Sequence, residues 1–475
     1  MKTDLFLGGK WSAGSDNDAI AVIDPATEDT ITEVAVASEA DAINAVEAAH
    51  EAGRAWAKRA PRDRAEILRK AFEIMIAHQD EVAEMIVREN GKCLRDARGE
   101  AGYAAEFFRW YSEEAVRNIG ELSISPAGVN RIMVMQQPVG VSVLVTPWNF
   151  PAAMATRKIG PALAAGCRVI LKPASETPLT ALAVASYLEE AGVPPGVVNV
   201  LPTRRSGPVV SAMLADPRVR KLSFTGSTPV GRILLAEAAK NVVNCSMELG
   251  GNAPFLVCAD ADIDAAVEGA MIAKMRNGGE ACTAANRFYV HEAVTEEFSD
   301  KFSKAMAALK VGPGMEPGVD LGPMVNQQSR EDIHELVTDA VARGAENITG
   351  GRPREGKGYF YLPTVLSRVP GDANVLSEEI FGPVAPIVSF TDYEQVIEAA
   401  NDTEYGLISY LYTRDLSRGL AMAEALDYGM VGINKGLVSD PAAPFGGTKQ
   451  SGIGREGAHD GMLEFCEKKY ICAEW

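Results

Sequence analysis

Short apolar runs alternate with helix-like segments across residues 168–257, and this alternation limits the fold more than any other feature of the chain. Each run is rich in branched apolar residues and short enough to be a buried strand. Segments such as 179–191 lie between the runs and carry apolar residues at helical spacing. Strands alternating with helices predict βαβ units around a parallel sheet, and a similar pattern after residue 282 predicts a second α/β domain. The runs are 168–171, 197–201, 221–224 and 255–257.

The flanking regions have different patterns. Residues 40–119 place apolar side chains at helical spacing between charged ones, which predicts several amphipathic helices. Two β-rich runs follow at 132–135 and 141–145, separated by Pro138-Val-Gly. The break predicts a hairpin and then a new strand.

Charge and cysteine content exclude several classes of function. With a formal net charge of −18, the chain is not expected to bind nucleic acid or an anionic membrane, because both require a basic face. The first residues lack the apolar core of a signal peptide, and no later stretch is apolar for the length of a bilayer span. Seven cysteines are scattered without paired or metal-type spacing, so we expect no metal site and a reducing, cytoplasmic location.

Five residues stand at places where chemistry is possible. Gly226 and Ser227 follow a predicted strand and open a helix, a position that suits a pyrophosphate, although an ordinary strand-to-helix turn has the same pattern. Cys282 lies in a segment of small residues with room for a ligand, whereas most single cysteines are inert core residues.

Two further residues are ambiguous in the same way. Glu248 ends an apolar strand, where burial raises the pKa of a carboxyl toward that of a useful base, but a capping or ion-paired glutamate would look alike. Asn149 follows a strand and precedes a helix, so its amide can point at a ligand oxygen or simply belong to a turn.

Taken together, these residues lie in motifs that resemble the aldehyde dehydrogenase superfamily from about Phe6 to the end of the chain. The spacing between Glu248 and Cys282 also resembles the family's base-to-nucleophile spacing. Finer features around Arg157, Arg287 and Ser439 are similar to succinate-semialdehyde dehydrogenases. The motifs, in chain order, are Pro147-Trp-Asn-Phe-Pro, Leu171-Lys-Pro-Ala-Ser, Phe224-Thr-Gly-Ser, Glu248-Leu-Gly-Gly, Gly279-Glu-Ala-Cys, Glu379-Ile-Phe-Gly-Pro and Pro444-Phe-Gly-Gly.

The resemblance implies a catalytic role for each of three residues. Cys282 is the nucleophile that attacks an aldehyde, and Asn149 together with the Cys282 backbone N–H holds the resulting oxyanion. Glu248 activates the water that cleaves the thioester. Because a free thiol has a pKa of about 8.5, an electropositive group is expected near Cys282.

The resemblance also implies a nicotinamide cofactor, NADP or NAD. NADP is expected to be preferred, because Ser175 stands where NAD-specific relatives often carry a ribose-binding glutamate. Glu176 argues for caution, since a one-residue shift would bring its carboxylate to the ribose. Arg204 and Arg205 are candidates for a further phosphate contact. The expected cofactor residues are Trp148, Asn149, Lys172, Pro173, Ala174, Ser175, Gly226, Ser227, Leu249, Glu379 and Phe381.

The expected substrate is a small semialdehyde, with Arg157, Arg287 and Ser439 binding its carboxylate. Succinate semialdehyde is the main expectation. Glutarate semialdehyde, one methylene longer, and a broader aldehyde range are the alternatives. A CoA-acylating relative is disfavoured by Glu248. A cofactor-free cysteine hydrolase is disfavoured because none of the five histidines lies in a recognised acid–base motif, and a non-catalytic binding protein is the remaining alternative.

Three positions depart from the family pattern. Glu280 replaces a usual glutamine and adds an ionisable group near Cys282 that could raise the thiol pKa. Ala284 replaces a second cysteine that some semialdehyde dehydrogenases carry, which removes a local disulfide switch. Lys435 replaces a small hydroxyl residue and faces either substrate or Asp440.

The resemblance predicts an α/β aldehyde dehydrogenase-like fold. A Rossmann-like cofactor domain is expected over residues 1–120 and 141–248, and a catalytic α/β domain over 249–450. A small β oligomerisation element, 121–140 with 451–475, is expected to support a homodimer or homotetramer.

Overall fold

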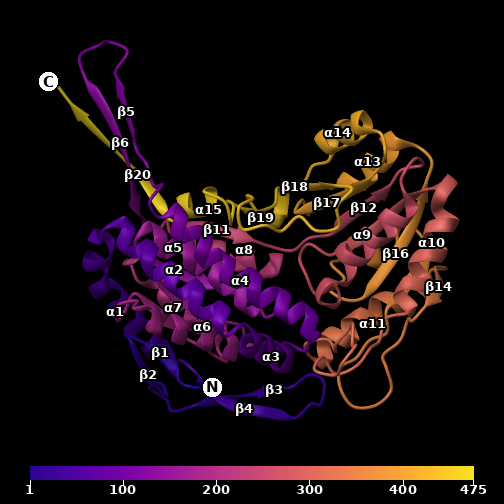
Figure 1. Ribbon diagram of the computed structural model, residues 1–475, viewed down its shortest axis with the longest axis horizontal. Helices are drawn as coiled ribbons and strands as arrows, with labels where there is room; N and C mark the ends of the chain where they lie inside the picture. The colour runs from indigo at the N-terminus through magenta and orange to yellow at the C-terminus, as the bar shows by residue number, and fades with distance from the viewer. Residues whose placement is uncertain (475) are drawn as a thin grey trace.

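The computed structural model describes residues 1–474 and consists of two α/β bodies with a projecting β arm (Figure 1). One body contains the N-terminal helices and an eight-stranded sheet, and the other contains a seven-stranded sheet. The arm extends away from both bodies and carries the end of the chain. The predicted fold class, two α/β domains with a small β element, is confirmed.

The eight-stranded sheet has the order β19-β11-β10-β7-β8-β9-β1-β2. Its central strands, β7 to β11, run parallel to one another, as the alternation of strands and helices predicts, whereas β1 and β19 pair antiparallel with β9 and β11. Because parallel strands need crossover connections, helices cover the sheet. The strands are β1 Leu5–Leu7, β2 Lys10–Ser12, β7 Val141–Val145, β8 Arg168–Lys172, β9 Val198–Val200, β10 Val219–Thr225, β11 Asn244–Glu248 and β19 Gly452–Ile453.

Four helices of this body, α1 to α4, account for the several amphipathic helices expected over residues 40–119. Helix α1 begins at a capping box, in which Ser38 and Asp41 satisfy each other's backbone N–H groups. Helix α5 begins with Pro151 and ends at Gly166, whose φ of 98° suits a helix C-terminus. The helices are α1 Glu39–Lys58, α2 Pro61–Ala77, α3 Gln79–Asn90, α4 Leu94–Glu114, α5 Pro151–Ala165, α6 Pro178–Ala191, α7 Ser206–Ala215 and α8 Thr228–Ala239.

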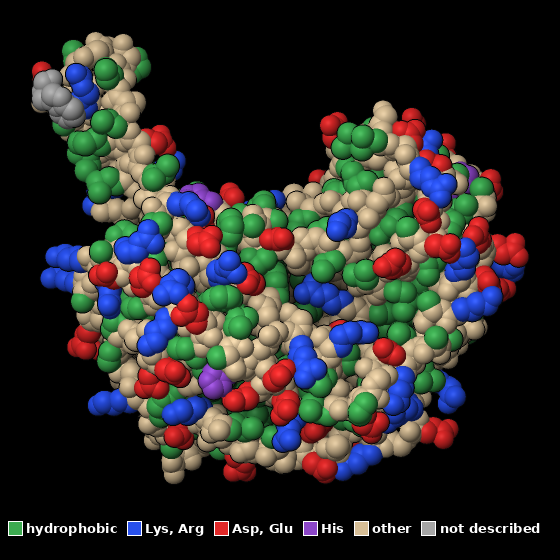
Figure 2. Space-filling model, in the orientation of Figure 1, with side chains coloured by type: hydrophobic (Ala, Val, Ile, Leu, Met, Phe, Trp, Pro, Cys, Tyr) green, Lys and Arg blue, Asp and Glu red, His purple; other side chains and the backbone are tan. Residues whose placement is uncertain are grey.

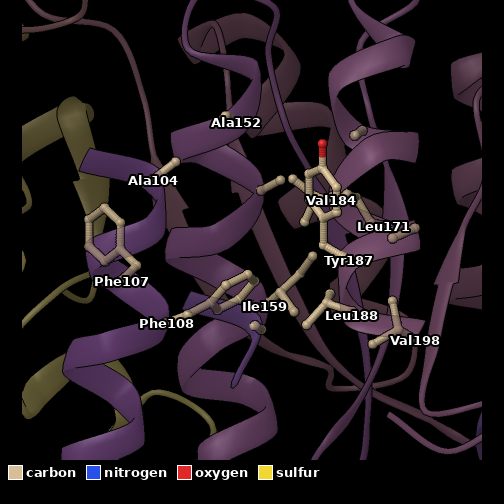
Figure 3. Close-up of a cluster of buried hydrophobic side chains, with 14 of the residues drawn as sticks. Ala104, Phe107, Phe108, Ala152, Ile159, Leu171, Val184, Tyr187, Leu188 and Val198 are labelled. Carbon is tan, nitrogen blue, oxygen red and sulfur yellow. The ribbon is translucent and has the colours of Figure 1, made fainter. Parts of the chain in front are cut away.

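The core of this body lies between helices and sheet. Figure 3 shows Phe108 of α4 beside Ile159 of α5, with Leu188 of α6 on the other side of Ile159 and Phe107 farther from it on α4. Every side chain of α5 is buried, so this helix has a fixed position between its neighbours. Since α4 and α5 both border the cavity described below, this packing also fixes one of its walls.

The seven-stranded sheet has the order β14-β15-β16-β13-β12-β17-β18, and all strands except β14 run parallel to their neighbours. Strand β18 is an edge strand. The strands are β12 Ala253–Val257, β13 Ala285–His291, β14 Glu346–Thr349, β15 Thr364–Ser367, β16 Val384–Phe390, β17 Ile408–Tyr412 and β18 Met430–Ile433. The helices are α9 Ile263–Met275, α10 Glu292–Ala307, α11 Gln327–Ala342, α12 Asn374–Ser377, α13 Tyr393–Asn401 and α14 Leu416–Ala425.

The arm is a three-stranded sheet of β5 (Glu121–Ile124), β6 (Arg131–Pro138) and β20 (Cys466–Ala473), in the order β20-β6-β5. The expected boundary at residue 451 is wrong, because β19 belongs to the eight-stranded sheet and α15 (Asp460–Leu463) packs on α5. Within the C-terminal segment that the structure describes, the residues that pair with the arm are Cys466–Ala473. A separate hairpin of β3 (Ala19–Ile23) and β4 (Thr30–Ala35) lies near the N-terminal end.

Candidate active site

The carboxyl edge of one sheet faces the amino edge of the other, and the candidate residues gather between them. Asn149, Lys172, Thr225 and Glu248 follow or end the parallel strands β7, β8, β10 and β11. In open α/β sheets, ligands bind at this edge. The second sheet contributes segments that precede its strands: the Cys282 loop before β13 and the 379–381 segment before β16.

A cavity of about 240 Å³ lies at this junction. Apolar and aromatic side chains form most of its wall, with a few polar groups among them. Such a composition is typical of a small-molecule site. The lining residues include Tyr103, Trp148, Asn149, Arg157, Arg276, Cys282, Glu379, Phe381 and Ser439.

Cys282 is presented by a tight reversal of the chain. Asn277 and Gly278 have φ of 52° and 62°, in the left-handed region, and they turn the backbone after α9 toward the cavity. Gly251 lies so close to the Cys282 carbonyl that a β-carbon at that position would approach the oxygen to 2.4 Å. The glycine in Glu248-Leu-Gly-Gly is therefore required for the strand that ends at Glu248 to pack beside the Cys282 loop.

Two opposing effects act on the pKa of the Cys282 thiol. Burial raises its pKa to about 12, and the charges of Arg157 and Arg276 act in the opposite direction. The expected electropositive groups are therefore present, but burial has the larger effect on the thiol pKa. A thiol in this state needs a nearby proton acceptor to become a nucleophile.

Asn149 is held by three residues, Lys92 before α4 and Asn277 and Glu280 in the turn after α9. Its side-chain Nδ2 donates to the Glu280 carbonyl at 3.1 Å, and its own carbonyl accepts from Lys92 Nζ at 2.7 Å and from Asn277 Nδ2 at 2.9 Å. Lys92 also forms a buried ion pair with Glu100. Since an amide NH₂ has two hydrogens, Asn149 keeps one available to the cavity that it lines.

Glu248 is buried behind the cavity wall rather than lining it. Its Oε2 has no hydrogen-bond partner within residues 1–474, and burial together with the charge of Glu456 raises its pKa well above the ordinary value. Glu456 pairs with Arg157, at 2.5 Å, and with Lys158. The carboxyl that is the candidate base therefore shares a buried charge cluster with three other residues.

The nicotinamide end of the expected cofactor site has a defined shape. Glu379 accepts from the Gly251 backbone N–H at 3.1 Å, and burial raises its pKa to about 7. Phe381, with a φ of 50°, packs edge-on against Trp148 at a centroid distance of 5.4 Å. These side chains line the cavity together with Thr225, Gly226, Ser227 and Leu249.

Backbone N–H groups at the start of α8 fit a diphosphate. Ser227 precedes the helix without a side-chain cap hydrogen bond, and Pro229 stands in its first turn. At Gly226 a β-carbon would approach the Phe224 ring to 2.5 Å. The sequence motif therefore forms a side-chain-free cradle at a helix N-terminus, as anion binding requires.

The residues expected to bind the adenine ribose lie at the end of β8, outside the cavity lining. Lys172 Nζ donates to Ser206 Oγ at 3.1 Å, and burial lowers its pKa to about 8. Ser175 Oγ donates to the Glu176 carboxylate at 3.0 Å, and Pro173 and Ala174 are buried beside it.

The additional arginines considered for this site are held elsewhere. Arg204 donates to the Ala19 carbonyl, and Arg205 donates to Glu39 at 3.2 Å. The structure therefore ties both side chains to the N-terminal segments.

The structure corrects one substrate-binding expectation. Arg287 lies in β13, and its guanidinium donates to the carbonyls of Asn252, Ala399 and Ala400 and to the Tyr428 hydroxyl. These hydrogen bonds hold the guanidinium inside the second body, and Arg287 does not line the cavity.

Arg276, which the sequence reading missed, takes the place expected of Arg287. It contacts Ser439 Oγ at 3.5 Å and lies 4.8 Å from the Phe150 ring centroid. The available sequence signal was its position directly before the Asn277-Gly278 turn. Arg157 and Ser439 do line the cavity.

The three unusual positions have distinct environments. The Glu280 carboxyl accepts from the Val325 N–H, and burial raises its pKa to about 8, so this group is mostly neutral near pH 7. Ala284 is buried. Lys435 is exposed and outside the cavity lining. Across residues 1–474, no group of three or more metal-ligating side chains is placed to hold a metal ion, and no helix is long and apolar enough to cross a membrane.

Residues 11–471 match the aldehyde dehydrogenase family, and the chain belongs to that family of oxidoreductases. Over 92% of its length it is 54% identical to a succinate-semialdehyde dehydrogenase of Paenarthrobacter nicotinovorans, of which 97% is covered. It is 48% identical to a glutarate-semialdehyde dehydrogenase of Pseudomonas aeruginosa, with coverage of 99% of this chain and 98% of the relative. A crystal structure described as an E. coli NADP-dependent enzyme superposes with a TM-score of 0.99 at 46% identity, covering 100% of this chain and 98% of the other.

Proposed function

We propose that this enzyme oxidises a small aldehyde bearing a carboxylate, most simply succinate semialdehyde to succinate, with NADP or NAD as the oxidant. The observation that carries the proposal is that Arg157, Arg276 and Ser439 line a largely apolar cavity that Cys282 also lines. Glutarate semialdehyde is the alternative, because one methylene is worth only about 1–3 kcal/mol. Relatives named for each substrate support both.

The chemistry of the chain's own residues follows from their positions. Cys282 attacks the aldehyde carbon, and the Asn149 amide with the Cys282 backbone N–H stabilises the oxyanion. The cofactor, when bound, supplies the acceptor for the hydride lost by the substrate carbon. Glu248 then removes a proton from the water that hydrolyses the Cys282 thioester, which releases the carboxylic acid.

The two cavity arginines are not equivalent. Arg157 already pairs with Glu456, so its charge is partly neutralised. Among residues 1–474, no carboxylate lies within ion-pair distance of Arg276. Arg276 is half-buried and has no such counterion, so an anionic substrate is expected to interact more favourably with Arg276 than with the already paired Arg157. We therefore assign Arg276 the larger part of carboxylate recognition.

The test compares kcat/KM for succinate semialdehyde, glutarate semialdehyde and butyraldehyde. Two charge-assisted hydrogen bonds of about 1.5–3 kcal/mol each predict a preference for the carboxylated aldehydes of about 10²–10⁴. In Arg276→Leu the preference is expected to fall about 10- to 100-fold, because one of these contacts is lost. Equal kcat/KM for butyraldehyde and succinate semialdehyde in the wild type would contradict a carboxylate-binding site in the cavity.

We propose that NADP is preferred over NAD. The Lys172 ammonium and the hydroxyls of Ser175 and Ser206 offer donors to a 2′-phosphate, and a similar structure is described as NADP-dependent. Pro173 and Ala174 give the loop its shape between these groups.

The selectivity test uses two neighbouring variants. Ser175→Glu should shift the kcat/KM ratio toward NAD by at least about tenfold, because its carboxylate repels the 2′-phosphate and accepts from the ribose hydroxyls. Glu176→Gln, the matched control, should move the ratio the other way by removing a negative charge. A wild type that favours NAD tenfold, or an unchanged ratio in Ser175→Glu, contradicts the assignment.

We further propose a homodimer or homotetramer in a reducing compartment such as the cytoplasm. Exposed Leu122, Ile124 and Val129 lie on the arm, where Figure 2 shows hydrophobic side chains gathered, and such patches favour association. Strands β20 and β18 are both open edges. All seven thiols are free, as in a reducing environment.

A further inference from the structure

The hydroxyl of Tyr103 is an unpaired polar group at the cavity. Tyr103 lies on α4 and lines the same cavity as Cys282 and Arg276. Its oxygen is shielded from solvent and has no hydrogen-bond partner within residues 1–474. Because buried polar groups are nearly always paired, an unpaired hydroxyl in a ligand cavity requires a functional explanation.

Two guanidinium groups act on this hydroxyl and cannot accept its proton, and the Glu456 carboxylate, whose charge also acts on the phenol, forms no hydrogen bond with it. The charges of Arg157 and Arg276 both act on the Tyr103 phenol, and Arg276 lies 5.8 Å from the ring centroid. A guanidinium has donors only, whereas a phenol can donate one hydrogen and accept others. The phenol hydrogen therefore lacks an acceptor on the protein side.

Packing alone does not account for the hydroxyl. The Tyr103 ring packs edge-on against Phe107, the next aromatic residue on the same helix face, at a centroid distance of 4.9 Å. A phenylalanine would make the same ring contact without burying an unpaired oxygen. The ring serves the core, but the hydroxyl contributes nothing to it.

We infer that Tyr103 is a substrate-binding residue, whose hydroxyl donates to the substrate carboxylate beside Arg276, Arg157 and Ser439. A carboxylate accepts about four hydrogen bonds and has no donor, so it is complementary to this set of groups. The inference rests on the proposed function and adds a neutral donor to its carboxylate site. A neutral donor strengthens binding of a carboxylate without adding a third positive charge to those of Arg157 and Arg276.

The experiment measures kcat/KM of Tyr103→Phe with succinate semialdehyde and with butyraldehyde at saturating cofactor. We expect the ratio of the two values to fall about 10- to 100-fold, the effect of one hydrogen bond to a charged group. The loss should appear mainly in KM, because the carboxylate is distant from the reacting carbon and is bound similarly before and during reaction. The inhibition constant of succinate against butyraldehyde oxidation should rise by a similar factor.

Tyr111→Phe is the matched control. Tyr111 also lies on α4, is fully buried and has an unpaired hydroxyl, but it does not line the cavity. Its substitution should leave the substrate ratio unchanged, and melting temperatures of both variants verify folding. An unchanged ratio in Tyr103→Phe, or equal losses for both aldehydes, overturns the inference. If the wild type itself does not prefer the carboxylated aldehyde, the proposed function fails instead.

Discussion

Cys282→Ala should lose aldehyde oxidation by a factor of about 10⁴ or more, since the variant has no nucleophile to form the covalent intermediate. The surrounding loop is held by the Gly251 approach and by Asn277, neither of which involves the sulfur, so the fold should persist. The measurement is absorbance growth at 340 nm with succinate semialdehyde, together with the melting temperature with and without NADP. A cofactor-induced rise in melting temperature would show that the variant keeps its cofactor site.

Cys472→Ala is the control for this prediction. Cys472 is an exposed thiol on the arm and is outside the cavity, so its removal should leave turnover unchanged. More than about one hundredth of wild-type turnover in Cys282→Ala would mean that the reaction does not pass through a thioester on this residue.

Glu248→Gln should separate the two halves of the reaction. Oxidation needs Cys282 and the cofactor, whereas thioester hydrolysis needs a base, so a burst of one reduced cofactor per active site should precede slow turnover. A general base contributes about 10²–10⁴-fold, and steady-state kcat should fall by that factor. Stopped-flow absorbance at 340 nm measures both phases.

The pH dependence should change in the same variant. Burial and the charge of Glu456 raise the pKa of Glu248, so its reactive carboxylate form becomes more abundant as pH rises through this raised pKa. Wild-type hydrolysis should therefore accelerate with increasing pH, and Glu248→Gln should lose this dependence.

Glu280→Gln is the matched control, because Glu280 is another buried carboxyl and glutamine can still accept from the Val325 N–H. It should show no burst. Full steady-state turnover in Glu248→Gln would assign the base to another residue.

The fold was largely predictable because its signals are local. The parallel strands β8, β9, β10 and β12 coincide with apolar runs, and their βαβ order depends only on alternation along the chain. The boundary at residue 451 failed for a non-local reason. Strand β19 has two residues, too few for a periodic signal, and its place in the sheet is set by pairing with Met247 and Glu248.

The site was less predictable because distance along the chain does not give direction in space. Arg287 is five positions beyond Cys282, but it lies within strand β13, and its side chain enters the core of the second body. Arg276 precedes a left-handed turn that reverses the chain and brings its side chain to the cavity. Tyr103 and Glu456 have no motif of their own, since they join the site only through packing of α4 and the C-terminal segment on α5.

The Arg157–Lys158–Glu456 cluster links the site to the timing of protein synthesis. Two cations on α5 depend on a carboxylate that a ribosome adds almost three hundred residues later. Until residue 456 has left the exit tunnel, these cations have no buried counterion, and complete docking of α5 carries the cost of unpaired charge. A nascent chain that has Cys282 but not Glu456 therefore lacks part of the charge cluster around Glu248. Catalytic competence is acquired as one of the last steps of maturation.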